Sequence, residues 1–180
     1  MMAGKEARGS IALGAVTTYP ALIKADKLAD DGKFDAAAQH VIAHLRQHPE
    51  EPQGLAKLGE LAMLLGGLGQ AEHFLRLAIA RGANQFDVRR NLASVLNQQE
   101  RLEEASVLLD ALTRESDDPQ LKGLYALTLD KMGRGDEART MLEGLIEEYP
   151  SRTPFWISYG HNLRAAGPVA QKVGVSRGRT

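Results

Sequence analysis

Two series of small residues recur along this chain of 180 residues at a nearly constant interval. The first series is spaced by 34, 34 and 33 residues and consists of Ala37, Ala71, Ala105 and Ala138. The second lies twelve positions upstream and consists of Ala25, Gly59, Ala93 and Ala126, with Gly160 next in phase. Such a period predicts a stack of similar units, because one small unit cannot bury its apolar surface alone and must share a core with its neighbours.

Each unit is predicted to hold two helices that cross where only a small side chain fits. Apolar residues keep the same phase as the small ones, which places them on one helix face. Glycine ends the first helix at little cost in three units, at Gly32, Gly66 and Gly133, whereas Glu100 stands at this place in the remaining one. The predicted helices cover residues 19–31 and 34–48, 53–65 and 68–81, 86–98 and 101–115, 119–132 and 135–149, and 153–166.

The residues at these positions form a known pattern. One unit contains Leu55, Leu58, Gly59, Ala71 and Ala78, and the next contains Leu92, Ala93, Leu96, Ala105 and Leu109. The final predicted helix, at 153–166, and the residue after it contribute Trp156, Tyr159, Gly160, Leu163 and Gly167. The pattern resembles a tetratricopeptide repeat (TPR) array over about residues 18–167, although Lys24, Arg89 and Lys122 depart from it. The resemblance implies an all-α fold, a right-handed TPR helical solenoid of about four helix-turn-helix repeats plus one extra helix.

The chain is predicted to divide into three parts. Residues 1–17 lack a sustained period and are expected to be a flexible leader. The array comprises repeats at about 18–51, 52–85, 86–118 and 119–152 and a half repeat at 153–167. Residues 168–180, in which Lys172 stands where the repeat places alanine, are either a disordered basic tail or the truncated or frame-altered end of a longer repeat protein. We favour truncation, because the last helix would otherwise leave apolar surface partly uncovered.

Composition excludes several classes of function. Lys and Arg number 22 against 23 Asp and Glu, which argues against a basic nucleic-acid binder. The chain has no cysteine, so a disulfide framework, a thiol nucleophile and a Cys-ligated metal are excluded. The sequence contains no run of 18 apolar residues, so no membrane-spanning helix is predicted. It has no convincing signal peptide either, so a cytoplasmic location is the default expectation. We expect no catalysis and no cofactor.

Three local motifs have a functional and a structural interpretation, and the structural one is favoured each time. His40, His44 and His48 have a metal-binding spacing on one helix, but they are expected to diverge. The glycine-rich stretch 66–69 follows no strand, so a phosphate loop is disfavoured and an inter-helix turn is expected. The Arg-Gly-Asp tripeptide at 134–136 occupies the equivalent turn.

A partner is expected in the concave groove that the first helices of a TPR array line. Residues near the small position of each unit would face the groove, and those predicted to contact a partner are Asp26, Glu60, Arg90, Ser94, Asn97, Gln98, Lys131, His161 and Arg164. Their polar and amide-rich character suits hydrogen bonding to a peptide. A merely solvated inner face is the open alternative. The lysine, asparagine and arginine set with which chaperone-tail-binding TPR proteins clamp a carboxylate is lacking.

Two functions follow from this interpretation. The leading one is a non-catalytic module that binds a protein or peptide in its groove. The alternative is a stand-alone scaffold that self-associates, for example as a homodimer, through Phe155, Trp156 and Tyr159 of the last helix. No nucleic acid or membrane partner is expected.

The segment 154–164, with Trp156, Tyr159, Gly160 and His161, is more particular than a generic repeat. It is similar to a Trp-x-x-Tyr-Gly-His segment in the repeat arrays that precede the catalytic domain of bacterial TPR-containing sulfotransferases. That resemblance implies the N-terminal interaction arm of such an enzyme, whose donor is 3′-phosphoadenosine 5′-phosphosulfate. The strand, phosphate loop and helix that would bind this donor are absent from the sequence, so this chain alone is not expected to transfer sulfate.

Overall fold

A computed structural model describes residues 19–83 and 85–167 of the chain. Within these ranges the backbone forms nine α-helices and no strand. The helices are α1 (Pro20–Asp30), α2 (Phe34–Gln47), α3 (Pro52–Leu64), α4 (Leu68–Ala80), α5 (Phe86–Gln98), α6 (Leu102–Glu115), α7 (Pro119–Lys131), α8 (Gly135–Glu148) and α9 (Thr153–Ala165). Each bound lies within one residue of its prediction, so the 34-residue period is confirmed as a helix-pair period. The predicted leader and tail lie outside the described residues.

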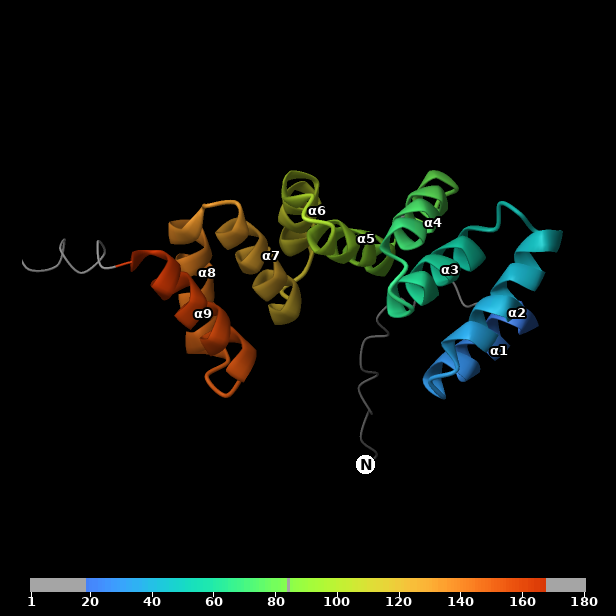
Figure 1. The fold of residues 1–180 in the computed structure, drawn as a ribbon, viewed down its shortest axis with the longest axis horizontal. Helices are drawn as coiled ribbons and strands as arrows, with labels where there is room; N and C mark the ends of the chain where they lie inside the picture. The colour runs from blue at the N-terminus through green and yellow to red at the C-terminus, as the bar shows by residue number, and fades with distance from the viewer. Residues whose placement is uncertain (1–18, 84, 168–180) are drawn as a thin grey trace, which may run out of the picture.

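The helices form an arched row in chain order, with α1 at one end and α9 at the other (Figure 1). Each helix packs mainly on its neighbours in sequence. In addition, consecutive odd-numbered helices contact one another, from α1 and α3 through α7 and α9, whereas no consecutive even-numbered pair among the described helices does so to the same extent. The odd-numbered helices therefore form an inner layer and the even-numbered helices an outer layer.

The small residues of the period lie at the crossings between the two layers. The four alanines of the outer helices are fully buried, and so are Ala25, Ala93 and Ala126 of the inner helices. At Gly59 the crossing is tightest, because a Cβ atom there would lie 2.7 Å from Cγ of Leu75 and 3.2 Å from its backbone nitrogen. Glycine at this position is therefore required by the packing of α3 on α4.

The turns from inner to outer helix share one geometry. Gly66 adopts a φ of +79°, and the amide of Gly67 then donates to the carbonyl of Ala62 at 2.8 Å, which ends α3 in a Schellman-type cap. Gly32 and Gly133 have the same conformation. Glu100 replaces glycine in the third turn and still adopts a φ of +59°. Its backbone is therefore in the left-handed region, which residues with a side chain avoid.

We expect Glu100→Gly to raise the free energy of unfolding by about 0.5–1 kcal/mol, because glycine relieves this strain. The gain is reduced by loss of the exposed ion pair with Lys131, in which Nζ and Oε1 are 2.8 Å apart. Glu100→Ala is the matched control, since it removes the ion pair and keeps the strain. Urea denaturation of the three proteins measures the effect. A Glu100→Gly protein no more stable than Glu100→Ala would contradict the assignment of strain.

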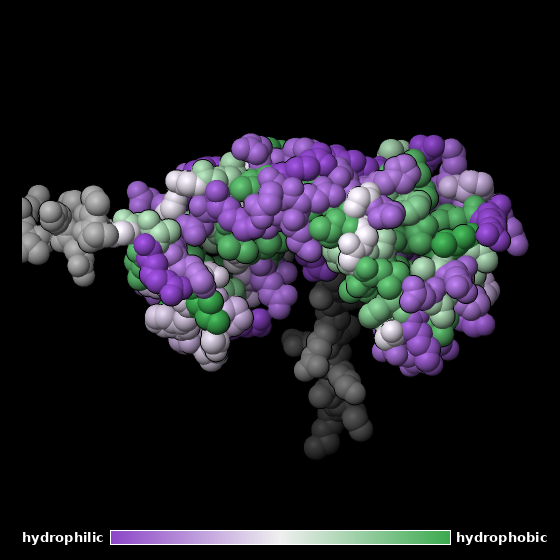
Figure 2. Space-filling model, in the orientation of Figure 1, coloured by the Kyte–Doolittle hydropathy of each residue, from purple (hydrophilic) through white to green (hydrophobic). Residues whose placement is uncertain are grey.

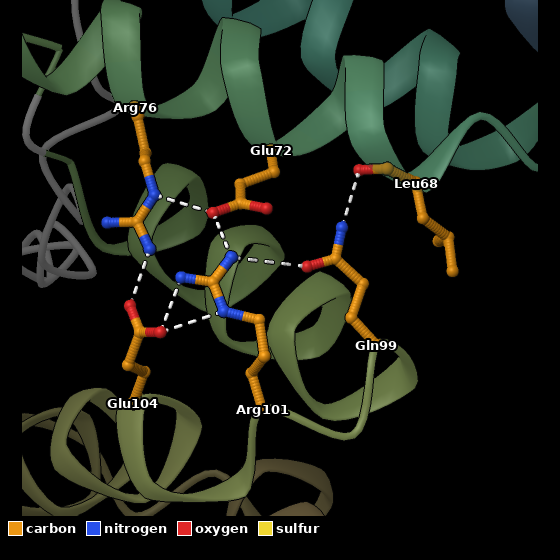
Figure 3. A network of polar contacts seen from close by, with 6 residues as sticks. All are labelled: Leu68, Glu72, Arg76, Gln99, Arg101 and Glu104. Atoms are coloured by element: carbon orange, nitrogen blue, oxygen red, sulfur yellow. Dashed lines mark hydrogen bonds and ion pairs between the residues drawn. The ribbon is translucent and has the colours of Figure 1, made fainter.

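A polar network joins the outer layer of the second and third repeats (Figure 3). Glu72 of α4 accepts hydrogen bonds from Arg76, at 2.8 Å, and from Arg101, while Glu104 of α6 also pairs with both arginines. Burial alone would raise the pKa of the Glu72 carboxyl, but the hydrogen bonds from the two arginines outweigh it and lower the pKa below its ordinary value. The network links α4 to the start of α6.

Candidate functional site

The candidate site is the inner face of the array. This face is formed by the side chains of α1, α3, α5, α7 and α9 that point away from the outer helices. In the first two repeats this face is charged and internally paired. Lys57 of α3 lies between Asp26 of α1 and Glu60 of its own helix, with its Nζ 2.8 Å from an oxygen of each. Burial alone would lower the pKa of Lys57, but its hydrogen bonds to the two carboxylates raise it above the ordinary value. The predicted residues Asp26 and Glu60 are thus brought together by a lysine that the sequence analysis did not select.

The middle of the inner face is polar. Arg90 pairs with Asp87 one turn earlier, at 3.0 Å, and the amide of Gln98 donates weakly to Ser94 at 3.4 Å. These partially exposed groups remain reachable from the groove. Figure 2 shows hydrophilic surface over α5 and α6, whereas apolar surface gathers over α3 and α4 in the same view.

Asn97 does not lie where the sequence analysis placed it. Only 4% of Asn97 is exposed, and its amide donates a hydrogen bond to the hydroxyl of Thr128 on α7, whose own proton goes to the carbonyl of Leu124. The prediction that Asn97 contacts a partner is therefore wrong. The residue instead joins two consecutive inner helices, because the fourth position after the small residue is covered by the next repeat.

A second polar junction of this kind was missed. Asn162 of α9 is 1% exposed and donates to the carboxylate of Asp130 at 2.6 Å and to the carbonyl of Gly135 at 2.8 Å. Its oxygen accepts from Nε of Arg139 at 3.0 Å. Repeat register could have found it, since Asn162 and Thr128 both stand two positions after the small residue of their helices, where α3 and α5 have Leu61 and Val95.

An apolar recess of about 330 Å³ lies between α7 and α9. Its lining includes Gly123 and Leu127 of α7, and Phe155 and Arg152 at the start of α9. Gly123 brings the helices close, because a Cβ there would lie 3.0 Å from Cε1 of Phe155. Leu127 is 40% exposed although it is a large aliphatic side chain. It has the same register as Asp26, Glu60 and Ser94, so the pattern that selected those residues would have selected it too.

The last turns of α7 and α9 each carry a basic side chain. Lys131 pairs with Glu100 at 2.8 Å, and the guanidinium of Arg164 lies 3.0 Å from Nδ1 of His161. The recess itself is bordered by Arg152. The inner helices α1 and α3 carry both signs of charge, whereas α9 has no acidic residue of its own.

Phe155 also departs from its prediction as a self-association residue. It is 6% exposed and packs into a core with Ala126, Leu142 and Leu145, so it is not available to a second chain. Trp156 remains half exposed and donates its indole N–H to the carbonyl of Pro150 at 2.9 Å. Tyr159 is partly exposed, and its hydroxyl donates to Glu143 at 2.9 Å.

His40 and His44 of α2 and His48, which follows it, do not form a shared metal site. His44 is buried against Tyr19 and His48, with ring centroids 4.5 and 4.9 Å apart, and lies 3.6 Å from Glu51. Across the described ranges, no three His, Cys, Asp or Glu side chains are grouped to hold a metal ion. The glycine-rich stretch 66–69 is the turn between α3 and α4, as expected. None of the helices described here is both long and apolar enough to cross a membrane.

Comparison with known proteins identifies the fold. No family model and no curated protein matches the sequence. Among solved structures, YrrB, described as a TPR protein with an unusual peptide-binding site, aligns with a TM-score of 0.73 and 17% identity over 82% of this chain and 76% of that chain. MamA AMB-1 aligns with a TM-score of 0.75 and 16% identity over 85% and 91%. MamA from Desulfovibrio magneticus RS-1 gives 0.74 and 16% over 81% and 84%.

At these identities the likeness defines the fold. The described chain is a TPR helical solenoid, as the 34-residue pattern predicted.

Proposed function

We propose that the protein is a non-catalytic interaction module that binds a peptide segment along its inner face, with one apolar side chain of the peptide in the recess between α7 and α9. The exposure of Leu127 carries the proposal, because a large aliphatic side chain beside an apolar hollow is the usual setting of an anchor residue. The inner face of a helical solenoid is also an extended concave surface of the kind that repeat proteins use for binding.

The charges of the inner face suggest the chemistry of the peptide. Arg152 beside the recess favours an acidic group next to the anchor. Ser94 and Gln98 on α5 offer hydrogen bonds to the peptide backbone, and the two carboxylates of Asp26 and Glu60, which share the single Lys57, favour a basic residue at the far end. The peptide would therefore run with its acidic end over α9 and its basic end over α1. A merely solvated inner face remains the competing hypothesis.

We expect Leu127→Glu to weaken binding of a peptide at least about tenfold, because the recess would then hold a charge where the anchor side chain must be desolvated. Peptides selected from a random library on the immobilised protein serve as probes, and fluorescence anisotropy gives the dissociation constants. Val107→Glu is the matched control, since Val107 is more exposed than Leu127 and lies on the outer helix α6. If Leu127→Glu and the double variant Arg90→Ala, Gln98→Ala both left every affinity unchanged, the inner face would not be the binding site.

The finer prediction, that this array is the arm of a sulfotransferase-like polypeptide, rests on the resemblance of residues 154–164. These residues belong to α9, which contributes one wall of the proposed recess. Sequencing the coding DNA beyond Thr180 in all three frames tests the prediction. A frame that restores the repeat and then encodes a glycine-rich phosphate loop would support a role in recruiting substrate to an enzyme.

A further inference from the structure

Within residues 19–83 and 85–167, one face of α9 has no cover of the kind that the other inner helices have. Leu163 stands three residues after the small position and is 43% exposed, whereas Leu96 and Leu129 at the same register of α5 and α7 are 1% and 2% exposed. In those helices this face is covered by the following outer helix. Trp156, Tyr159, Gly160 and Leu163 lie at i, i+3, i+4 and i+7, so they form one stripe along the helix, which we call the α9 stripe.

The centre of the α9 stripe is an empty hole. A Cβ atom on Gly160 would meet no atom within 4 Å, while one on Gly59, its equivalent in α3, would lie 2.7 Å from Leu75. In the complete repeat the hole above the glycine is filled by a large aliphatic side chain from an antiparallel helix. Gly160 presents the same hole to the outside.

The residues that follow α9 in sequence do not suit this hole. In each complete repeat the outer helix covers the inner one with an alanine five residues after the positive-φ residue and a valine or leucine nine residues after it, as at Ala71 and Leu75 after Gly66. Gly167 has a φ of +62° and holds the same place, but five and nine residues later the sequence has Lys172 and Ser176. Lys and Ser at these two buried positions would leave a charge and a hydroxyl against an apolar face.

We propose that the α9 stripe is a dimerisation surface that takes the α9 helix of a second copy of this chain. The stripe is self-complementary, since it offers both a glycine hole and, four residues before and three residues after it, the exposed side chains of Trp156 and Leu163. A two-fold axis between Gly160 and Leu163 brings the second α9 antiparallel and sets Leu163 of each copy over Gly160 of the other, as Leu75 lies over Gly59 within one chain.

The border of the stripe favours a second copy over a charged partner. Glu143 of α8 borders it through the hydroxyl of Tyr159, and the exposed Arg164 directly follows Leu163 on α9, so both signs of charge are present. A surface with a border of one sign would repel its own copy, whereas a border of mixed sign allows pairing across the two-fold axis. One helix stripe is smaller than a standard interface, so the dissociation constant is expected at about 10–100 µM.

Sedimentation equilibrium of the full chain from about 5 to about 500 µM tests the proposal across that range. The wild-type chain is expected to pass from monomer to dimer. Gly160→Leu fills the hole without a clash inside the monomer, and Leu163→Glu places like charges across the axis, so each is expected to weaken the dimer at least about tenfold. Val107→Glu adds the same charge on α6, outside the stripe, and is expected to dimerise as the wild type does.

Three outcomes would overturn the proposal. The first is a wild-type chain that stays monomeric throughout the range. The second is a dimer that Gly160→Leu and Leu163→Glu leave intact, which would place the interface elsewhere. The third is a chain that dimerises only after residues 168–180 are removed, since these residues would then be the cover of the stripe. Because Leu127 lies outside the stripe, failure of the dimer would leave the peptide-binding proposal standing.

Discussion

Replacing Gly59 with leucine is expected to lower the free energy of unfolding by about 3 kcal/mol, or roughly 6–12 °C in melting temperature. The new side chain must occupy space in which even a Cβ atom lies 2.7 Å from Cγ of Leu75 and 3.2 Å from its backbone nitrogen. Leu75 is fully buried and its backbone belongs to α4, so neither can move aside without shifting the two helices apart. Thermal unfolding followed by circular dichroism measures the loss.

The same substitution at Gly160 is the matched control. Both glycines stand at the small position of an inner helix, but a Cβ on Gly160 meets nothing within 4 Å. Gly160→Leu is therefore expected to leave the fold intact and to gain up to about 1 kcal/mol from the better helix propensity of leucine, measured where the chain is monomeric. Equal effects of the two substitutions would mean that the close approach of α3 and α4 does not determine stability at this crossing.

The helix pairs could be predicted almost to the residue, because the features that define them are local and repeated. Small residues mark the crossings, and glycine or proline marks the ends. Even Glu100, which breaks the glycine pattern, adopts the positive φ that the turn requires. The shared turn geometry, fixed by packing on both sides, outweighs the preference of this one residue.

The inner face was predicted less well, for a reason that also lies in the repeat. Whether a side chain faces the groove or the next repeat depends on how far consecutive units are shifted, and the shift is set by packing between them. Asn97 is therefore buried against Thr128, although its position on the helix alone would place it in the groove. Lys57 was missed because its role comes from a carboxylate on another helix, Asp26, which one-helix register cannot show.

The polar junctions also indicate how the array differs along its length. Between α5 and α7, Asn97 meets Thr128, and between α7 and α9, Asp130 meets Asn162. At the same register of α3 and α5 the sequence has an apolar pair, Met63 and Val95. Apolar contacts tolerate small displacements, whereas hydrogen bonds between buried groups fix one geometry. The proposed recess lies between α7 and α9, beside the second of these junctions, so its walls are held by directional bonds.

Asn162→Ala is accordingly expected to lower stability by about 2–4 kcal/mol and to act mainly on α9. The substitution removes the donor from the Asp130 carboxylate and the Gly135 carbonyl, and the acceptor from Arg139, at a place that is 1% exposed. Because the units of a solenoid contact mainly their neighbours, a terminal helix can separate while the remaining repeats stay folded.

The single tryptophan of the chain makes this separation measurable, since Trp156 lies on α9. In the wild type, its fluorescence and the circular dichroism of the whole array are expected to change together on heating. In Asn162→Ala the fluorescence transition is expected to move to lower temperature than the circular dichroism transition. Asn97→Ala is the control: it breaks one hydrogen bond and leaves the Thr128 hydroxyl bonded to the Leu124 carbonyl, so a loss of about 1 kcal/mol without separation of the two transitions is expected. Coincident transitions in Asn162→Ala would show that α9 is held by its apolar contacts and not by this junction.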